Sequence, residues 1–158
     1  MNCGGSEKIL LTLLRHIDRS KFRASLVLGT NTGVFINEIP DDVELINFNT
    51  TRIRYSVTKF IKLIQYKNPH IVFSAIGHLN LLIIMLRPLL PSGIKFICRE
   101  TNIPSLKYKK LSSLRLYSFL YRAYYNKYDT IICQSKDMAT DLIENFNVHQ
   151  SLISIINN

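Results

Sequence analysis

Helical and strand-like patterns of apolar residues alternate along almost the whole chain of 158 residues. Apolar residues at three- and four-residue spacing predict helices at residues 6–17, 55–66, within 78–90, within 111–126 and at 136–146. Short β-rich runs predict strands at residues 22–28, 43–48, 70–76, 94–98, 130–133 and 151–156. Because strands joined mostly by helices need crossover connections, this order favours an α/β fold with a doubly wound, mostly parallel, Rossmann-like sheet and helices on both faces.

The size of the chain predicts a single domain over residues 1–158, since no linker or internal repeat interrupts it. Its composition, with 47% hydrophobic and 20% charged residues, is typical of a folded globular protein. The longest apolar stretch, residues 79–90, is interrupted by Arg87 and Pro88 and is too short to span a bilayer. The first residues do not resemble a signal peptide, so we expect a cytoplasmic protein.

The cysteines and histidines give little support to redox or metal chemistry. Three cysteines form no CxxC pair, and Cys98 and Cys133 lie in apolar strand-like runs, which indicates reduced, unreactive buried thiols. The four histidines are scattered, and no carboxylate or cysteine cluster has the spacing of metal ligands. We therefore expect no metal and no bound cofactor.

The start of the first predicted helix carries two adjacent glycines, Gly4 and Gly5, followed by Ser6 and Glu7. Such a helix start can hold a phosphate group through its backbone amides and the helix dipole. Alternatively, the segment is an ordinary helix start in which Ser6 caps the helix and Glu7 complements the dipole. The spacing alone leaves both interpretations open.

Further short segments follow in a defined order. They are Gly4-Gly5-Ser6-Glu7-Lys8-Ile9-Leu10, Leu13-Leu14-Arg15-His16-Ile17-Asp18, Asn68-Pro69-His70-Ile71-Val72-Phe73-Ser74, Gly77-His78-Leu79-Asn80-Leu81-Leu82, Arg99-Glu100-Thr101-Asn102, Tyr128-Asp129-Thr130-Ile131-Ile132-Cys133-Gln134-Ser135 and Ile153-Ser154-Ile155-Ile156-Asn157-Asn158. The ordered set, which covers essentially the whole chain, resembles the N-terminal, acceptor-side half of a GT-B glycosyltransferase of family 4.

The resemblance implies a role for this chain in sugar transfer. In that family two Rossmann-like domains face each other across a cleft, one mainly holding the acceptor and the other the nucleotide-sugar donor. A glycan or lipid-linked acceptor, used in cell-surface polysaccharide or glycoconjugate synthesis, is the expected substrate. The resemblance also implies retention of the anomeric configuration without a required metal.

The resemblance assigns two groups of candidate site residues. Gly4 and Gly5 would line the cleft near the donor diphosphate, where amides stabilise charge on the leaving group. The candidates for the acceptor or cleft are His78, Asn80, Arg99, Glu100, Asn102 and Ser135. Several of these follow or end strands, and ligands bind at the carboxyl edge of open α/β sheets.

These assignments have simpler alternatives. His78 could cap the next helix, and Arg99 with Glu100 could form a salt bridge at the sheet edge. Some related enzymes carry a histidine just after this strand, whereas this chain has Glu100 and Thr101 there. No catalytic residue is therefore assigned.

Residues 101–128 contain no acidic residue, while basic and tyrosine side chains mingle along them: Lys107, Lys109, Lys110, Arg115, Arg122 and Lys127 with Tyr108, Tyr117, Tyr121, Tyr124, Tyr125 and Tyr128. A basic, aromatic helix can lie on an anionic membrane surface or hold the phosphate of a lipid-linked acceptor. It can equally be a solvated helix whose apolar side packs on the sheet. The formal charge of +9 would also favour nucleic acid, but no recognised reader motif is present and we expect none to bind.

Two parts of the family pattern are not found in these 158 residues. A strand normally precedes the glycine pair in the centre of the sheet, and without it two half-sheets would result unless neighbouring elements close the gap. The donor-binding domain would follow the last strand. We expect the chain alone to be inactive; the alternative is a non-catalytic acceptor- or membrane-binding subunit that pairs with a separate donor-binding chain.

Overall fold

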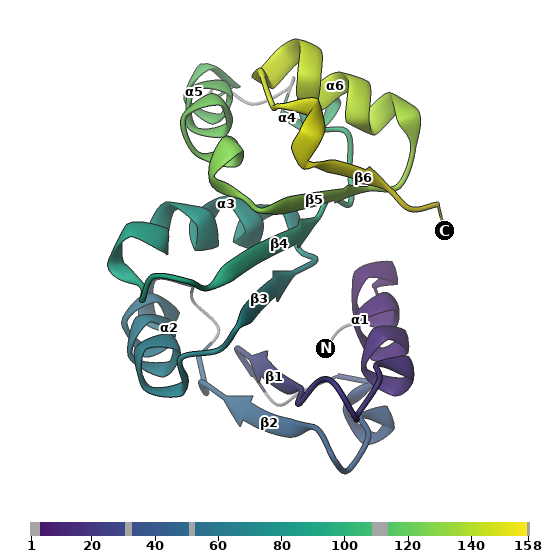
Figure 1. The fold of residues 1–158 in the computed structure, drawn as a ribbon, viewed down its shortest axis with the longest axis vertical. Coiled ribbons are helices and arrows are strands. Elements are labelled where there is room, and N and C mark those ends of the chain that lie inside the picture. The colour runs from purple at the N-terminus through teal and green to yellow at the C-terminus, as the bar shows by residue number, and fades with distance from the viewer. Residues whose placement is uncertain (1–3, 31–32, 51–52, 109–113, 158) are drawn as a thin grey trace. The chain divides into compact units, whose positions relative to one another are not determined.

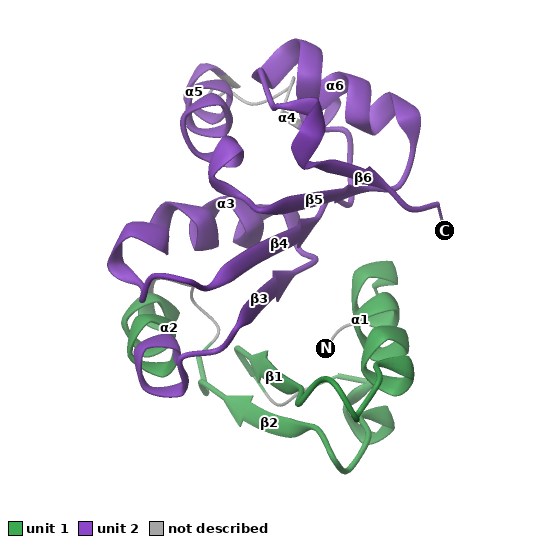
Figure 2. Ribbon diagram, viewed as in Figure 1, with its two compact units in different colours: residues 1–63 green, residues 64–158 purple. Residues whose placement is uncertain are grey.

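The structure is a computed structural model that describes residues 4–30, 33–50, 53–108 and 114–157 (Figure 1). The chain divides into two compact units, unit 1 with residues 1–63 and unit 2 with residues 64–158 (Figure 2). The division lies inside helix α2 (Ile53–Lys67). Each unit contains its own parallel sheet, and the prediction of a single domain stays a prediction.

Unit 1 contains the helix α1 (Gly5–His16), the strands β1 (Ser25–Leu28) and β2 (Glu44–Asn47), and the 3-10 helix η1 (Ile36–Glu38). The two strands pair in parallel, with Ser25 opposite Glu44. A small core forms where α1 packs on this sheet, and its buried members are Leu14, Leu26 and Val43. Ion pairs from the end of α1 and the residues after it, Arg15 with Glu38 and Arg19 with Asp42, connect this part to the segment before β2.

Unit 2 is built on a four-stranded parallel sheet in the order β3-β4-β5-β6. The strands are β3 (Ile71–Ser74), β4 (Lys95–Arg99), β5 (Thr130–Cys133) and β6 (Ile153–Ile155). The connecting helices are α3 (Gly77–Leu86), α5 (Leu114–Tyr124) and α6 (Lys136–Phe146), with the short helices α4 (Pro104–Tyr108), η2 (Arg87–Leu89), η3 (Tyr125–Lys127) and η4 (Gln150–Leu152). Because successive right-handed crossovers step in the same direction, α3, α5 and α6 lie along one side of this sheet (Figure 1).

The core of unit 2 lies between the sheet and this helix layer. Alternate strand residues point toward the helices, and those of the two central strands, such as Phe96, Cys98 and Ile131, are buried. Tyr121 of α5 stacks on Tyr125 with ring centres 4.0 Å apart. Three of the tyrosines in the basic and aromatic segment, Tyr121, Tyr125 and Tyr128, therefore belong to the core.

The helix and strand order predicted from the sequence is confirmed, as is the α/β class with parallel sheets and flanking helices. The described strands fall into two sheets, β1-β2 and β3-β4-β5-β6, so the expectation of two half-sheets is confirmed. The short helices, including α4 and η2, were not predicted because they span a single turn or so and carry no repeated periodicity. In the part of the chain that is described, no helix is long and apolar enough to cross a membrane.

Candidate functional site

The site lies in unit 2, at the carboxyl ends of β3, β4 and β5. There β3 leads into α3 at Gly77, β4 ends at Arg99, and β5 leads through Gln134 to α6. The amide of Glu100 donates to the carbonyl of Ile132 at 2.9 Å, which continues the pairing of β4 with β5. The Gln134 side-chain amide donates to the Glu100 carbonyl at 2.8 Å. These bonds fix the chain where the candidate residues follow the strands.

Glu100 is a buried carboxylate held among the helices of unit 2. It is only 2% exposed. Its Oε1 atom accepts hydrogen bonds from the hydroxyl of Tyr125 and, at 3.4 Å, from Nδ2 of Asn80. Arg99 immediately precedes Glu100. Because side chains alternate between the two faces of a sheet, Arg99 points away from the face of β4 on which Cys98 and the helix layer lie.

Burial raises the pKa of Glu100 above its usual range, because a charged carboxylate loses its water there. The hydrogen bonds from Tyr125 and Asn80 and the charge of Lys107 pull this pKa down, but not enough to cancel the burial. A carboxyl group in this setting can hold a proton nearer to neutral pH than a solvated glutamate.

Asn80 connects α3 to the end of β4. Its Nδ2 donates to the carbonyl of Arg99 at 3.1 Å, and its own carbonyl accepts from the hydroxyl of Tyr128 at 2.6 Å. The side-chain oxygen Oδ1 is buried and has no hydrogen-bond partner within the ranges that the structure describes. The contacts seen for Asn80 are thus within the protein, and they position the carboxyl group of Glu100.

A small polar cradle surrounds Gly77, the first residue of α3. A Cβ atom added to this glycine would lie 3.5 Å from Nζ of Lys107, 3.6 Å from Oε2 of Glu100 and 3.8 Å from Oγ1 of Thr101. These are ordinary van der Waals distances, so a methyl group at this position would contact an ammonium, a carboxyl and a hydroxyl without a clash. We call Gly77, Glu100, Thr101 and Lys107 the Gly77 cradle.

The position of Lys107 in this cradle depends on α4. The backbone amide of Ser105, in the first turn of α4, donates to Oδ2 of the buried Asp141 on α6 at 3.1 Å. Asn145 donates to the other carboxylate oxygen at 2.8 Å. Since α4 is held on α6 in this way, the side chain of Lys107 extends from a fixed turn toward the end of β4.

His78 follows Gly77 in the first turn of α3, where Ile76 is the N-cap residue and no side-chain capping bond forms. The alternative in which His78 caps this helix is therefore wrong. Partial burial, followed by the charge of Lys107, lowers the pKa of His78 below its usual value. The imidazole is neutral at neutral pH and can accept a hydrogen bond from a hydroxyl group.

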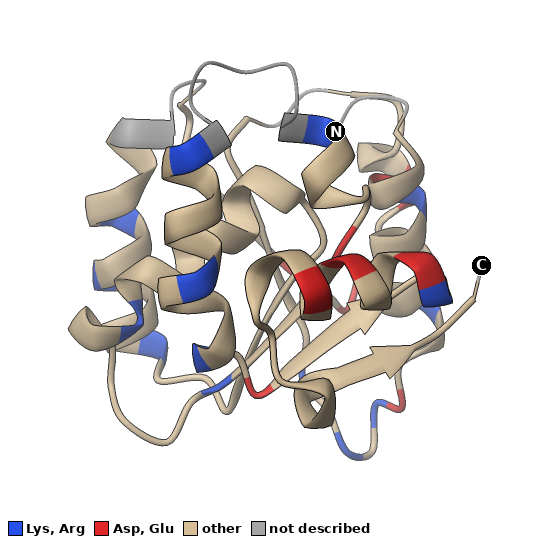
Figure 3. Ribbon diagram, turned by 90° about the horizontal axis from the view of Figure 1, so that it is seen from above, with Lys and Arg blue, Asp and Glu red and all other residues tan. Residues whose placement is uncertain are grey.

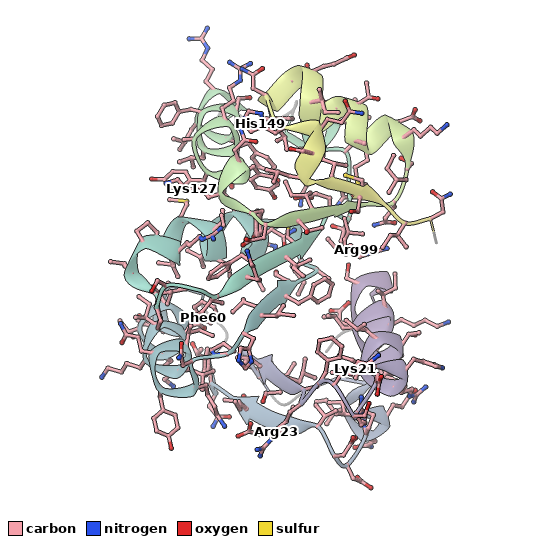
Figure 4. All side chains as sticks on the ribbon, in the orientation of Figure 1. Lys21, Arg23, Phe60, Arg99, Lys127 and His149 are labelled. Carbon is pink, nitrogen blue, oxygen red and sulfur yellow. The ribbon has the colours of Figure 1, made fainter. Side chains whose placement is uncertain are left out.

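Arg99 lies on the side of the sheet away from α3, α5 and α6 (Figure 4). Its side chain is largely buried, and this burial lowers the pKa of the guanidinium while leaving it charged. Asn102, by contrast, is exposed and donates to Oγ1 of Thr101 at 3.0 Å. It borders an open depression whose other lining residues are Ile103, Leu106 and Lys107.

Ser135 begins α6 as its N-cap residue. Its hydroxyl oxygen accepts from the amide of Met138 at 3.2 Å, a contact that satisfies one of the free amides at a helix start. The structure therefore gives Ser135 a helix-capping contact next to the site, and its role as a cleft residue stays a prediction.

The glycine pair belongs to unit 1. Gly4 is the N-cap residue of α1 and Gly5 the first helical residue, with no side-chain capping bond. The alternative in which Ser6 caps this helix is therefore wrong, because the helix begins before Ser6. Glu7 does lie in the first turn, and a Cβ added to Gly4 would meet its carboxylate. Phosphate binding by Gly4 and Gly5 stays a prediction.

Sequence reasoning did not select Lys107, Thr101 or Tyr125 as members of the site. Lys107 is one of several basic residues in its segment, and its spacing from Glu100 follows no motif. Its place is set by the contact of α4 with Asp141, which joins residues 36 positions apart. Such long-range contacts leave no local pattern in the sequence.

The arrangement suits the recognition of a hydroxyl group. A hydroxyl in the Gly77 cradle can donate to the carboxyl oxygen of Glu100 and accept from the ammonium of Lys107. Among the described residues, no three His, Cys, Asp or Glu side chains gather in a metal-ligand set.

The family model for Glycosyltransferase Family 4 matches residues 3–158. The chain belongs to this family. The match spans both units and confirms the resemblance on which the cleft assignments rest, and with the parallel sheets it supports a Rossmann-like domain of the GT-B N-terminal type. A search of curated proteins finds no match to this chain.

Proposed function

We propose that this chain provides the acceptor-binding side of a glycosyltransferase that moves a sugar from a nucleotide-sugar donor to a glycan or a lipid-linked acceptor. The family supports sugar transfer in general. The Gly77 cradle is the observation that supports the acceptor side, because it offers a donor and an acceptor to one hydroxyl group at the carboxyl edge of the sheet.

In this proposal Glu100, Lys107 and His78 have different tasks. Glu100, held in place by Tyr125 and Asn80, accepts a hydrogen bond from a hydroxyl group of the acceptor. Lys107 donates a hydrogen bond to the oxygen of that hydroxyl group. The neutral His78 accepts a hydrogen bond from a further hydroxyl group of the acceptor. Glycans present neighbouring hydroxyl groups that match this set, and the product would be a polysaccharide or glycoconjugate of the cell surface.

We further propose that transfer requires a donor-binding domain beyond the residues described. In the family pattern the donor is held mainly by the second domain, and the cradle carries no diphosphate-sized cluster of cations. Incubation of the purified 158-residue chain with nucleotide sugars and acceptors should give no product. Turnover by the chain itself would contradict this part, whereas activity gained on adding a separate donor-binding chain would favour a two-chain enzyme.

Acceptor binding can be measured directly by amide NMR of the isotope-labelled chain. Suitable probes are cellobiose, N,N'-diacetylchitobiose and farnesyl diphosphate-linked N-acetylglucosamine, with UDP-glucose and GDP-mannose as donor probes. At least one acceptor probe should shift the amides of Gly77, Thr101 and Asn102. If the donor probes shift these amides and the acceptor probes do not, or if none of the probes does, the acceptor assignment is wrong.

The variant Gly77→Ala sharpens this test because the added methyl group occupies the cradle at ordinary contact distances. Alanine also favours the helix, so the fold should be kept. We expect the variant to lose the acceptor-induced shifts. Thr140→Ala, at an exposed position of α6, is the control and should bind as the unchanged protein does. Equal binding by Gly77→Ala would remove the cradle from the site.

A further inference from the structure

The outer face of α5 combines exposed apolar side chains with arginines. Among the side chains of this helix that the structure describes, the exposed ones are Arg115, Leu116, Phe119, Arg122 and Ala123. Their spacing of one, four, seven and eight residues after the first places them on one face, since an α-helix has 3.6 residues per turn. Leu116 is 57% exposed and Phe119 is 66% exposed. We call these five residues the α5 outer face.

The exposed apolar side chains of the α5 outer face do not belong to the core of unit 2. The opposite face of α5 is already filled by Tyr121, which stacks on Tyr125 and lies 4.9 Å from the ring of Phe146. Tyr121 and Tyr125 are at most 1% exposed. Because this packing fixes the rotation of the helix, Leu116 and Phe119 stay turned outward.

Helix α6 provides an internal comparison, since it has the same length of 11 residues and lies on the same side of the sheet. The exposed positions of α6 are polar or charged, and they include Asp137 and Glu144. Figure 3 shows the acidic residues gathered along α6, whereas α5 carries only basic ones. The apolar exposure of α5 is therefore a property of this helix and not of the layer.

Both charged residues of the α5 outer face, Arg115 and Arg122, are positive. Residues 101–128 contain six Lys and Arg and no Asp or Glu. Arg122 is held along the surface by donating to the carbonyl of Asn145 at 3.1 Å and 3.3 Å. The apolar centre with flanking arginines complements a surface that is anionic outside and apolar just beneath it.

We propose that the α5 outer face docks this protein onto an anionic lipid bilayer. The 11 residues of α5 span about 16 Å, which suits a helix lying in the plane of the interface. Leu116 and Phe119 enter the acyl boundary, and Arg115 and Arg122 contact lipid phosphates. This docking is independent of sugar transfer and goes beyond the proposed function.

Co-sedimentation with vesicles tests the proposal on the full chain. Vesicles of phosphatidylcholine alone are compared with vesicles that also contain phosphatidylglycerol. The protein should bind the anionic vesicles, and added salt should weaken the binding. Absence of binding to the anionic vesicles would overturn the proposal.

Variants locate the binding surface. Leu116→Ser combined with Phe119→Ser should lower the partition coefficient at least about tenfold, because two exposed apolar side chains no longer enter the bilayer. Arg115→Gln should lower it about fivefold. Tyr66→Ser is the matched control, since Tyr66 is an 85% exposed aromatic residue on α2, and its binding should be unchanged.

Four results would contradict membrane docking by this face. The first is a double variant that binds as well as the unchanged protein, and the second is an equal loss with Tyr66→Ser. The third is a dimer in sedimentation velocity that the double variant dissociates, which would assign the face to a second copy of the chain. Inorganic diphosphate that inhibits vesicle binding more than sodium chloride does at equal ionic strength would indicate a phosphate pocket instead. This result, too, would overturn the proposal.

Discussion

Replacing Glu100 by glutamine should change how the stability of this protein depends on pH. Burial raises the pKa of Glu100 in the folded state above its ordinary value of 4.5. The folded protein therefore favours the protonated carboxyl more than the unfolded chain does, and glutamine imitates that neutral form. The stability contributed by protonation is complete below pH 4.5 and is lost as the pH rises through the higher folded pKa.

The magnitude follows from the size of the shift, because each pKa unit corresponds to about 1.4 kcal/mol. We compare the free energy of unfolding of the unchanged protein with that of Glu100→Gln. As the pH rises from below the unfolded pKa to above the folded pKa, the first value minus the second should fall by about 1.4 kcal/mol for every unit that separates the two pKa values. Glu100 is 2% exposed, so solvent screens this effect little.

Urea unfolding followed by circular dichroism, at a series of pH values from about 4 to 8, measures this difference. Thr140→Ala, which removes no titratable group from an exposed position of α6, provides the control and should show almost no such trend. A difference for Glu100 that stays constant, or that grows with rising pH, would refute the reasoning. A constant difference would mean that the hydrogen bonds and Lys107 cancel the effect of burial on the pKa, and a growing difference that they outweigh it.

Further predictions concern neighbouring groups. Burial raises the pKa of Asp129, but hydrogen bonds, the first from the backbone amide of Phe96, lower it more. In urea unfolding at neutral pH, Asp129→Asn should therefore lower the free energy of unfolding by about 1 to 2 kcal/mol. This loss should shrink as the pH falls below 3.8 and through the lower pKa of the folded state. Ser135→Ala should lower the unfolding free energy by about 1 kcal/mol through loss of the α6 cap, and an unchanged value would contradict that contact. Burial raises the pKa of Cys98 well above its usual value and that of Cys133 to about 12, so neither thiol should react with a disulfide reagent until denaturant is added, and rapid labelling of either in native protein would disprove their burial.

The sequence predicted the fold better than the site, and the reason is the range of the interactions involved. Helices and strands follow from periodicities of a few residues, so the elements of unit 2 could be placed nearly to their ends. The boundary of β4 at Arg99 shows the limit, because the expected strand ended one residue earlier at Cys98. There the backbone stays extended into a charged residue that hydropathy alone would exclude.

The candidate residues at the strand ends could be selected, but their contacts could not. Nothing local indicates that Glu100 is bound by Tyr125, 25 residues later, or that Asp141 holds α4 and so positions Lys107. The tyrosines illustrate the same point, because the basic and aromatic segment divides into core and surface residues only once α5 is packed. Lys109 and Lys110 of that segment lie outside the described residues, as does Cys3.

The order β3-β4-β5-β6 means that each strand of unit 2 pairs with the strand made just before it. During synthesis, each newly completed strand and its preceding helix can add to a sheet that already exists. No strand needs to be inserted between two finished neighbours, a step that would delay folding until a distant segment had emerged. Unit 2 can therefore grow in the direction of translation, with β6 added last at its edge.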